Sequence, residues 1–294
     1  MPSFQSAGLE LYYEQHGARA NPTVLLIHGL TCQLIHWPEP LIRSLTSAGF
    51  RVVTLDNRDV GLSARLDDHD IGSIEMVMQD PRSFSAPYGL TELAGDCVAL
   101  LNHLGQSGAH LVGFSMGGMV AQRLALDAPE RVFSLTSIAS STSDPDLPGG
   151  DRAAFDAFVS TPPPERDAAI AHLSNGWRVL GGSHYDSARV GLGRLAQAAY
   201  DRGYSAAGAA RQLLAILHAA PRGEALSKLD VPALVIHGDA DPLVPLAAGE
   251  RTAERLRGAR LAVFEHLGHD LPEPLLGALA EEITAHLGRV PVAR

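Results

Sequence analysis

The chain has 294 residues, of which 46% are hydrophobic and 19% charged, so it can build one large core or a core with an insertion, and it is not a disordered polyelectrolyte. Its formal net charge is −10, from 33 acidic and 23 basic residues, which excludes nucleic acid and anionic membrane surfaces as expected partners. Lys228 is the only lysine, and no Gly-Lys-Ser/Thr phosphate loop occurs.

The opening segment "MPSFQSAGLELYYEQHG" has neither the cationic start nor the apolar stretch of a secretory signal. No apolar run approaches the length of a membrane span. The two cysteines, Cys32 and Cys97, are far apart and in no metal or redox spacing, which is typical of free thiols in a reducing compartment. We therefore expect a cytoplasmic protein with no membrane partner.

The first 140 residues alternate short apolar runs with longer amphipathic ones. The stretch "LELYYEQHG" predicts an antiparallel leading strand. Nearly continuous apolar runs, typical of strands buried on both faces, follow at 23–27, 51–55, 109–113 and 132–138. Helices are predicted at 38–48, 91–104 and 116–127, the second with Thr91 as N-cap and Gly105 as stop signal. This alternation favours a mostly parallel sheet covered by helices on both faces.

The alternation stops between residues 141 and 229, where no clear strand is seen. This segment contains the turn-rich stretches "SSTSDPDLPGG" and "STPPPERD" and is otherwise Ala-rich and helix-like. Strands resume at 233–236 and 260–264, with helices at 247–256 and 273–287. We therefore predict an α/β core in two parts, 1–140 and 230–294, with a helical cap or lid inserted at 141–229.

The stretch "GFSMGG" places Ser115 between a predicted strand and a predicted helix, with Gly113 and Gly117 two positions away on either side. This is the context of a nucleophile elbow, a tight turn that lifts a serine hydroxyl out of the sheet at a helix N-terminus. Ser115 is therefore the expected nucleophile.

A serine nucleophile needs a general base and a residue that orients it. In an open α/β sheet these follow the carboxyl ends of later strands. His269 follows the last predicted strand, and Asp239 and Asp241 follow the strand before it. Because Pro242 restrains its backbone, Asp241 is preferred over Asp239 as the orienting acid.

A serine that attacks a carbonyl group also needs two backbone N–H groups to bind the oxyanion that forms. One is expected from Met116, directly after the nucleophile, and the other from Leu30, in the loop after "VLLIHG". Cys32, close to that loop, is either a reactive thiol or a small residue of the pocket wall.

The motifs "HGL", "DNRDVGLS", "GFSMGG", "GDADPLVP" and "GHD" occur in an order that resembles the α/β-hydrolase fold superfamily over nearly the whole chain. The stretches "NRDVGLS", "GFSMGGMVAQ" and "WRVLGG" are similar to its aclacinomycin methylesterase-like branch, which cleaves a methyl ester on a polyketide. The resemblance implies a mostly parallel eight-stranded sheet, a helical cap and serine esterase activity. The chain departs from the family at Arg58-Asp59, where Arg-Gly is common.

The sequence thus predicts a serine hydrolase that cleaves carboxylic esters of small apolar molecules through an acyl-enzyme, with Trp37, Trp177 and Leu243 in the substrate pocket. No cofactor is expected, because "GLGRLA" at 191–196 lacks a preceding strand, and no metal, because His266 and His269 lack a third ligand nearby. Three alternatives stay open: a lactonase, a cofactor-free perhydrolase or haloperoxidase with the same triad, and a small-molecule receptor with little turnover. The natural substrate and the oligomeric state, a homo-oligomer included, also stay open.

Overall fold

The computed structural model describes residues 2–185 and 191–290, so each of the three predicted segments includes residues outside the described part. The described residues form an eight-stranded sheet in the order β1-β2-β4-β3-β5-β6-β7-β8. Its strands are β1 Ser3–Ser6, β2 Leu9–His16, β3 Thr23–Ile27, β4 Arg51–Leu55, β5 Ala109–Phe114, β6 Val132–Ile138, β7 Ala233–Gly238 and β8 Arg260–Phe264.

Strand β2 pairs antiparallel with β1 on one side and with β4 on the other, and every pair of neighbours from β4 to β8 in the sheet order is parallel. The predicted mostly parallel sheet with an antiparallel leading strand is therefore confirmed. Every residue of β3, β4, β5 and β7 is buried, because helices cover both faces.

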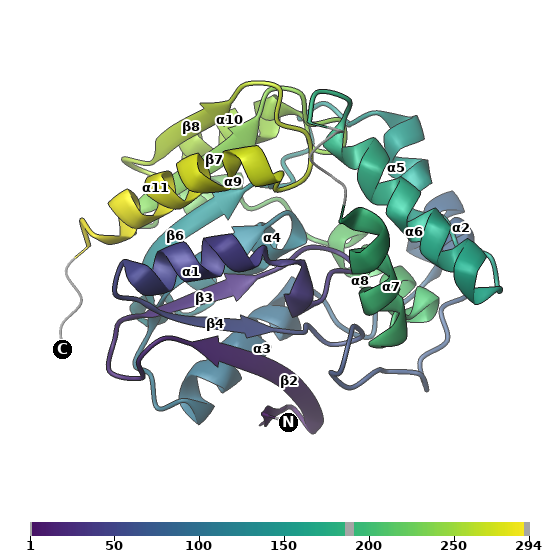
Figure 1. Cartoon of the computed structure of the whole chain (residues 1–294), viewed down its shortest axis with the longest axis horizontal. Helices are drawn as coiled ribbons and strands as arrows, with labels where there is room; N and C mark the ends of the chain where they lie inside the picture. Colours follow the sequence, from purple (N-terminus) through teal and green to yellow (C-terminus); the bar gives the residue numbers. More distant parts are fainter. Residues whose placement is uncertain (1, 186–190, 291–294) are drawn as a thin grey trace.

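Two helical layers enclose the sheet. Helices α1 (Glu39–Ser47) and α11 (Leu276–Leu287) lie in front of it in Figure 1 and pack on one face. Helices α3 (Leu90–His103) and α4 (Met116–Asp127) pack on the other face. Helix α10 (Leu246–Arg255) connects the last two strands, and no helix among the described residues is both long and apolar enough to cross a bilayer.

The predicted N-cap of α3 was wrong. The N-cap of α3 is Gly89 and not Thr91, since the Gly89 backbone is extended and its N–H donates to the Glu92 carboxylate at 2.7 Å. The predicted stop at Gly105 is confirmed, because this residue follows the C-cap with φ 67°.

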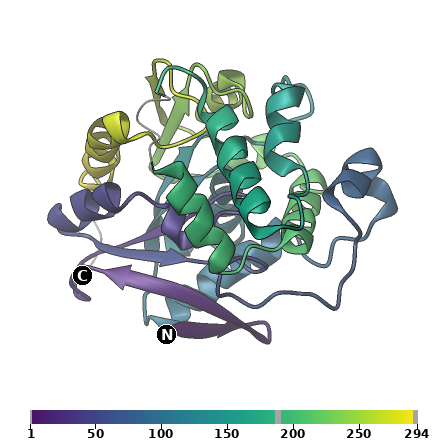
Figure 2. The same cartoon turned by 45° about the vertical axis from the view of Figure 1, so that its right-hand side comes forward.

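Between residues 141 and 229, the described part of the chain holds helices and no strand. They are α5 Arg152–Val159, α6 Arg166–Gly181, α7 Leu192–Asp201, α8 Ala206–Leu217 and α9 Gly223–Leu226. Helices α5 to α8 gather at the end of the sheet to which the arrows of β3 and β4 point, beside the short helix α2 (Ile74–Gln79) (Figure 1). The turned view brings these teal and green helices forward (Figure 2).

A buried ion pair ties this helical segment to the core. Asp59, in the loop after β4, has φ 72°, a backbone region that favours glycine. Its carboxylate accepts two hydrogen bonds from Arg211 of α8, at 2.9 and 2.7 Å, and one from the Tyr88 hydroxyl at 2.7 Å. The departure from the family's Arg-Gly pattern therefore provides an anchor for α8.

We expect Arg211→Met to lower the free energy of unfolding by about 3–5 kcal/mol, because it leaves a buried carboxylate without its cation. The double variant Asp59→Gly/Arg211→Met removes both charges and places glycine at the positive φ, so it is expected to recover at least half of that loss. Urea denaturation measures both. Arg152→Met, which breaks an exposed pair with Asp156, is the control and is expected to cost less than about 1 kcal/mol. A double variant no more stable than the single one would contradict this account.

Candidate active site

Ser115 lies in a strained turn between β5 and α4. Its backbone has φ 56° and ψ −121°, a conformation that residues other than glycine rarely adopt. The Ser115 N–H donates to the Ile138 carbonyl at 2.8 Å, and the Ser140 hydroxyl donates to the Ser115 carbonyl at 2.7 Å. The end of β6 therefore holds the Ser115 N–H, and the loop after β6 holds the Ser115 carbonyl.

The glycines around Ser115 are required by close backbone packing. A Cβ atom at Gly113 would lie 2.3 Å from the Gly117 carbonyl oxygen, and one at Gly117 would lie 1.9 Å from the Ile27 carbonyl oxygen. No side chain fits at either distance, so β3, the turn and the start of α4 touch only because both positions are glycine.

The structure brings Ser115, His269 and Asp241 together. The His269 Nε2 atom is 2.9 Å from Ser115 Oγ, and its Nδ1 atom is 2.7 Å from Asp241 Oδ2. The other carboxylate oxygen of Asp241 accepts the N–H groups of Leu243 and Val244 at 2.9 and 2.8 Å. His269 and Asp241 are buried, and Ser115 is partly exposed. The carboxylate is thus fixed by the backbone on one side and bound to the imidazole on the other.

Asp239 makes a different contact from Asp241. Its Oδ1 atom accepts the His266 N–H at 2.6 Å, which joins the loop after β7 to the loop after β8. His237, which the sequence analysis did not select, lies with Nε2 2.8 Å from the Val244 carbonyl oxygen. Burial lowers the pKa of His237, so the neutral imidazole donates this bond and holds the Asp241 loop.

The loop after β3 passes directly against the nucleophile. A Cβ atom at Gly29 would lie 3.0 Å from the Ser115 Cβ. Among the described residues, the N–H groups of Leu30 and Met116 have no hydrogen-bond acceptor, as is required of donors reserved for a ligand. Burial raises the pKa of the Cys32 thiol, which donates to the Leu30 carbonyl at 3.3 Å, so Cys32 supports the loop as a neutral thiol.

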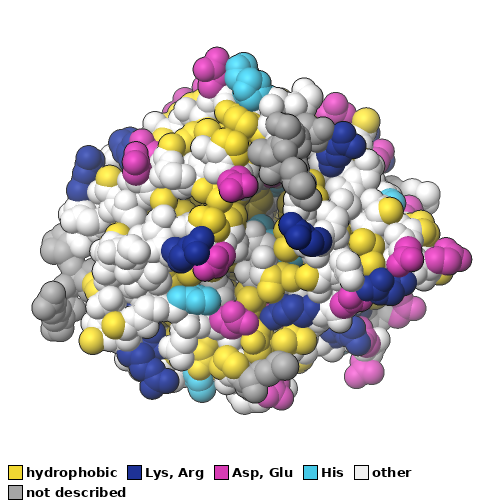
Figure 3. Space-filling model, viewed as in Figure 1, with side chains coloured by type: hydrophobic (Ala, Val, Ile, Leu, Met, Phe, Trp, Pro, Cys, Tyr) yellow, Lys and Arg dark blue, Asp and Glu magenta, His cyan; other side chains and the backbone are white. Residues whose placement is uncertain are grey.

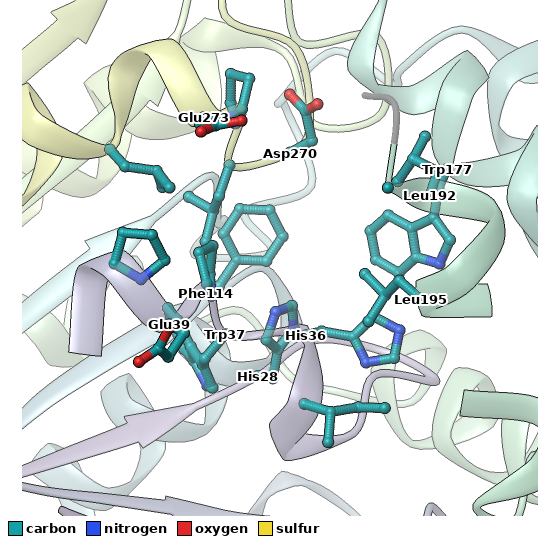
Figure 4. A pocket seen from close by; sticks show the side chains of 17 residues that line it. His28, His36, Trp37, Glu39, Phe114, Trp177, Leu192, Leu195, Asp270 and Glu273 are labelled. Atoms are coloured by element: carbon teal, nitrogen blue, oxygen red, sulfur yellow. The ribbon is translucent and has the colours of Figure 1, made fainter. Parts of the chain in front are cut away.

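A cavity of about 470 Å³ opens beside these residues (Figure 4). Trp37 and Trp177 both line it, together with His36, Phe114, Leu192 and Leu195. On the face seen in Figure 3, hydrophobic side chains gather in a central hollow with charged side chains around it. Phe114 and Asp270 also line the 470 Å³ cavity, and they are the chain neighbours of Ser115 and His269. Leu243 is not among the lining residues, and its N–H instead binds Asp241.

Comparisons with known proteins agree with this fold. A family profile described as the alpha/beta hydrolase fold matches residues 22–273. The chain is 30% identical to rhodomycin D methylesterase DauP of Streptomyces sp. (strain C5), over 94% of this chain and 94% of that protein. It is 31% identical to rhodomycin D methylesterase DnrP of Streptomyces peucetius, again over 94% of both chains. The crystal structure of the enol-lactonase from Burkholderia xenovorans LB400 is similar in fold, with a TM-score of 0.76 and 22% identity over 98% of this chain and 100% of that chain.

Two histidines beside the cavity stay neutral near pH 7. Burial lowers the pKa of His36 to about 4 and that of His28 well below its usual range. The Gln33 N–H donates to His36 Nδ1 at 3.0 Å, and the Gly29 N–H donates to His28 Nδ1 at 2.8 Å. The His28 ring therefore accepts a backbone N–H at Nδ1, which places the ring proton of its neutral form on Nε2, whereas His36 Nδ1 also lies 3.1 Å from the Gln33 carbonyl oxygen.

The low pKa of His36 makes stability depend on pH. Because its folded pKa of about 4 lies below the unfolded value of about 6.5, folding favours the neutral ring. The contribution is complete above about pH 6.5 and is lost as pH falls through about 4. We expect the free energy of unfolding, measured in urea at pH 7, 6, 5 and 4, to decrease over this range. His36→Gln is expected to show a shallower decrease, and an identical slope in both proteins would contradict the assignment.

Proposed function

This chain belongs to the α/β-hydrolase fold family and is a carboxylic-ester hydrolase, and we propose that Ser115, His269 and Asp241 are its catalytic triad. The observation that carries the proposal is the pair of hydrogen bonds, 2.9 Å and 2.7 Å long, that joins the three side chains. These distances fall within the hydrogen-bond reach that proton transfer needs.

In the proposed reaction, Ser115 Oγ attacks the ester carbonyl while His269 Nε2 takes its proton. The tetrahedral intermediate then expels the alcohol, to which His269 returns the proton, and an acyl-enzyme forms. A water molecule, deprotonated by His269, hydrolyses this acyl-enzyme. Asp241 holds the imidazole in the required tautomer and stabilises its positive charge.

The Leu30 and Met116 N–H groups are proposed to bind the oxyanion. Support comes from the lack of an acceptor for either group in the described part of the chain and from the close approach of Gly29 to Ser115. Met116 is the first residue of α4, so the partial positive charge of that helix N-terminus favours the same developing negative charge.

We further propose that the 141–229 segment is a lid that sets substrate choice. Trp177 of α6 and Leu195 of α7 form one wall of the cavity, opposite Trp37 and Phe114. A cavity with this lining suits an ester with a bulky, mostly apolar acyl group. Since the two relatives named above are methylesterases, a methyl ester is favoured as the bond that is cleaved.

The alternatives differ in their support. A lactone would be opened by the same steps, and perhydrolysis would start from the same acyl-enzyme, but no contact in the site favours either over ester hydrolysis. The receptor alternative is set aside, because the chain is a carboxylic-ester hydrolase.

The triad is tested with Ser115→Ala and p-nitrophenyl butyrate as the ester. Loss of the nucleophile is expected to lower kcat on the order of a millionfold, with the fold intact by circular dichroism. Retention of more than a few per cent of wild-type activity by the folded variant would exclude Ser115 as the nucleophile.

The two aspartates provide a matched comparison for the orienting acid. Asp241→Asn is expected to lower kcat by about 10⁴, because an amide favours the wrong imidazole tautomer. Asp239→Asn makes the same chemical change two positions away, where the carboxylate binds the His266 N–H, and is expected to lower kcat less than about tenfold. If Asp239→Asn proved the more damaging to kcat, the orienting acid would be Asp239.

The lid proposal is tested with Trp177→Ala. Loss of one aromatic wall is expected to lower kcat/KM for methyl 2-naphthoate about tenfold relative to that for p-nitrophenyl acetate, since a contact of this size contributes roughly 1–2 kcal/mol. Val179→Ala, at an exposed position of the same helix, is the control and should leave the ratio unchanged. Equal losses on both esters would indicate a packing role for Trp177.

A further inference from the structure

We infer that Gln212, on helix α8, is a positioning residue for the oxyanion hole, because its side chain holds the loop that carries the Leu30 N–H. The inference rests on the proposed function, since it takes Leu30 and Met116 as the oxyanion donors. Gln212 belongs to the 141–229 segment, so a helix far away in sequence supports the loop next to the nucleophile.

Both ends of the Gln212 amide are used. Its Oε1 atom accepts the Thr31 N–H at 2.9 Å, and its Nε2 atom donates to the Arg58 carbonyl at 3.0 Å. The side chain is fully buried. Thr31 lies in the loop after β3 and Arg58 in the loop after β4, so one buried amide joins both loops to α8.

The loop after β3 needs this support because its backbone is strained. Thr31 has φ 63°, which is unfavourable for a β-branched residue and costs about 1–3 kcal/mol. Its turn is closed by one backbone hydrogen bond, from the Cys32 N–H to the Gly29 carbonyl at 3.2 Å. Without an acceptor for the Thr31 N–H, relaxation of this residue would turn the adjoining Leu30 peptide and displace its N–H from the oxyanion.

Gln212 is itself held in place by its neighbours. The preceding residue, Arg211, forms the buried ion pair with Asp59. One turn earlier, a Cβ atom at Gly208 would lie only 2.3 Å from the Asp59 carbonyl oxygen, so α8 is in direct contact with the loop after β4. Helix α8 therefore cannot slide along this loop, and the Gln212 amide has a fixed position relative to Thr31.

An N–H group that is positioned for the oxyanion stabilises the transition state much more than it stabilises the bound ester. Removal of one oxyanion donor costs about 10²–10³ in kcat. Loss of the Gln212 hydrogen bonds displaces the Leu30 N–H without removing it. The expected decrease in kcat is therefore smaller, about 10–100-fold. KM should change little, because the ground-state carbonyl gains much less from these N–H groups.

The test compares two variants of Gln212 with p-nitrophenyl butyrate as substrate and an alkyl trifluoromethyl ketone as transition-state analogue. Gln212→Met keeps the size but removes both hydrogen bonds, and we expect kcat to fall about 10–100-fold with KM within about threefold of wild type. Its Ki for the ketone should rise by about the same factor as kcat/KM falls. Gln212→Glu, in its protonated form, offers the same acceptor and donor, so it should restore kcat to within about fivefold of wild type.

Gln122→Met is the matched control. Gln122, on α4, is also fully buried and bonded at both ends, to Ser137 at 3.4 Å and to Arg222 at 3.1 Å, but neither bond reaches the loop after β3. It is expected to lower the melting temperature and to leave kcat and the ketone Ki within about twofold of wild type. A Gln212→Met enzyme that loses stability in the same way but keeps kcat and the ketone Ki would overturn the inference.

Two further results separate this inference from the proposed function. If Ser115→Ala is inactive and Gln212→Met is fully active, the role of Gln212 is rejected and the proposed triad stands. If Ser115→Ala is active, both the triad and the role of Gln212 are rejected.

If Gln212→Met is too unstable to assay, Gln212→Asn keeps an amide in the buried site but withdraws it from Thr31. Loss of kcat in that variant supports the inference, and wild-type kcat overturns it.

Discussion

The backbone of Ser115 is held at φ 56°, and the packing of three neighbouring strands maintains this conformation. Strand β3 contacts the start of α4 through Gly117, the end of β6 binds the N–H of Ser115, and the loop after β6 binds its carbonyl. A strained turn of this kind costs about 1–3 kcal/mol and persists only where its surroundings allow no other conformation. The buried parallel sheet provides these surroundings, so the position of the serine hydroxyl depends on the core as a whole.

The helical segment takes part in the site as well as covering it. The Asp151 N–H donates to the Pro242 carbonyl at 2.7 Å, beside Asp241, and the His269 N–H donates to the Leu180 carbonyl at 2.8 Å. With the bond from Thr31 to Gln212, the segment contacts the loops that carry Asp241, His269 and Leu30. Changes in this segment are therefore expected to alter the geometry of the candidate site and the stability together, and not only the shape of the pocket.

The elements that the sequence predicts best are those whose burial is uniform. The fully buried strands read as continuous apolar runs, and α4 has the predicted bounds because the elbow motif marks where it begins. The prediction of Thr91 as the N-cap of α3 was wrong, because the extended residue Gly89 is the N-cap and its N–H binds the Glu92 carboxylate. It did not identify His36 or Gln212, because no local pattern distinguishes a buried imidazole or amide near a site from one elsewhere in the core.

The sequence by itself determined the strand–helix order, the elbow at Ser115 and the candidates Asp241 and His269, since each depends on residues close together in the chain. Only the tertiary structure decided that Asp239 binds the His266 backbone, that Leu243 lies outside the cavity lining and that Asp59 pairs with Arg211. The last contact spans 152 residues, and that between Thr31 and Gln212 spans 181. Such partners share no local motif, because their contact depends on how distant helices and loops pack and on which buried polar groups must be satisfied there.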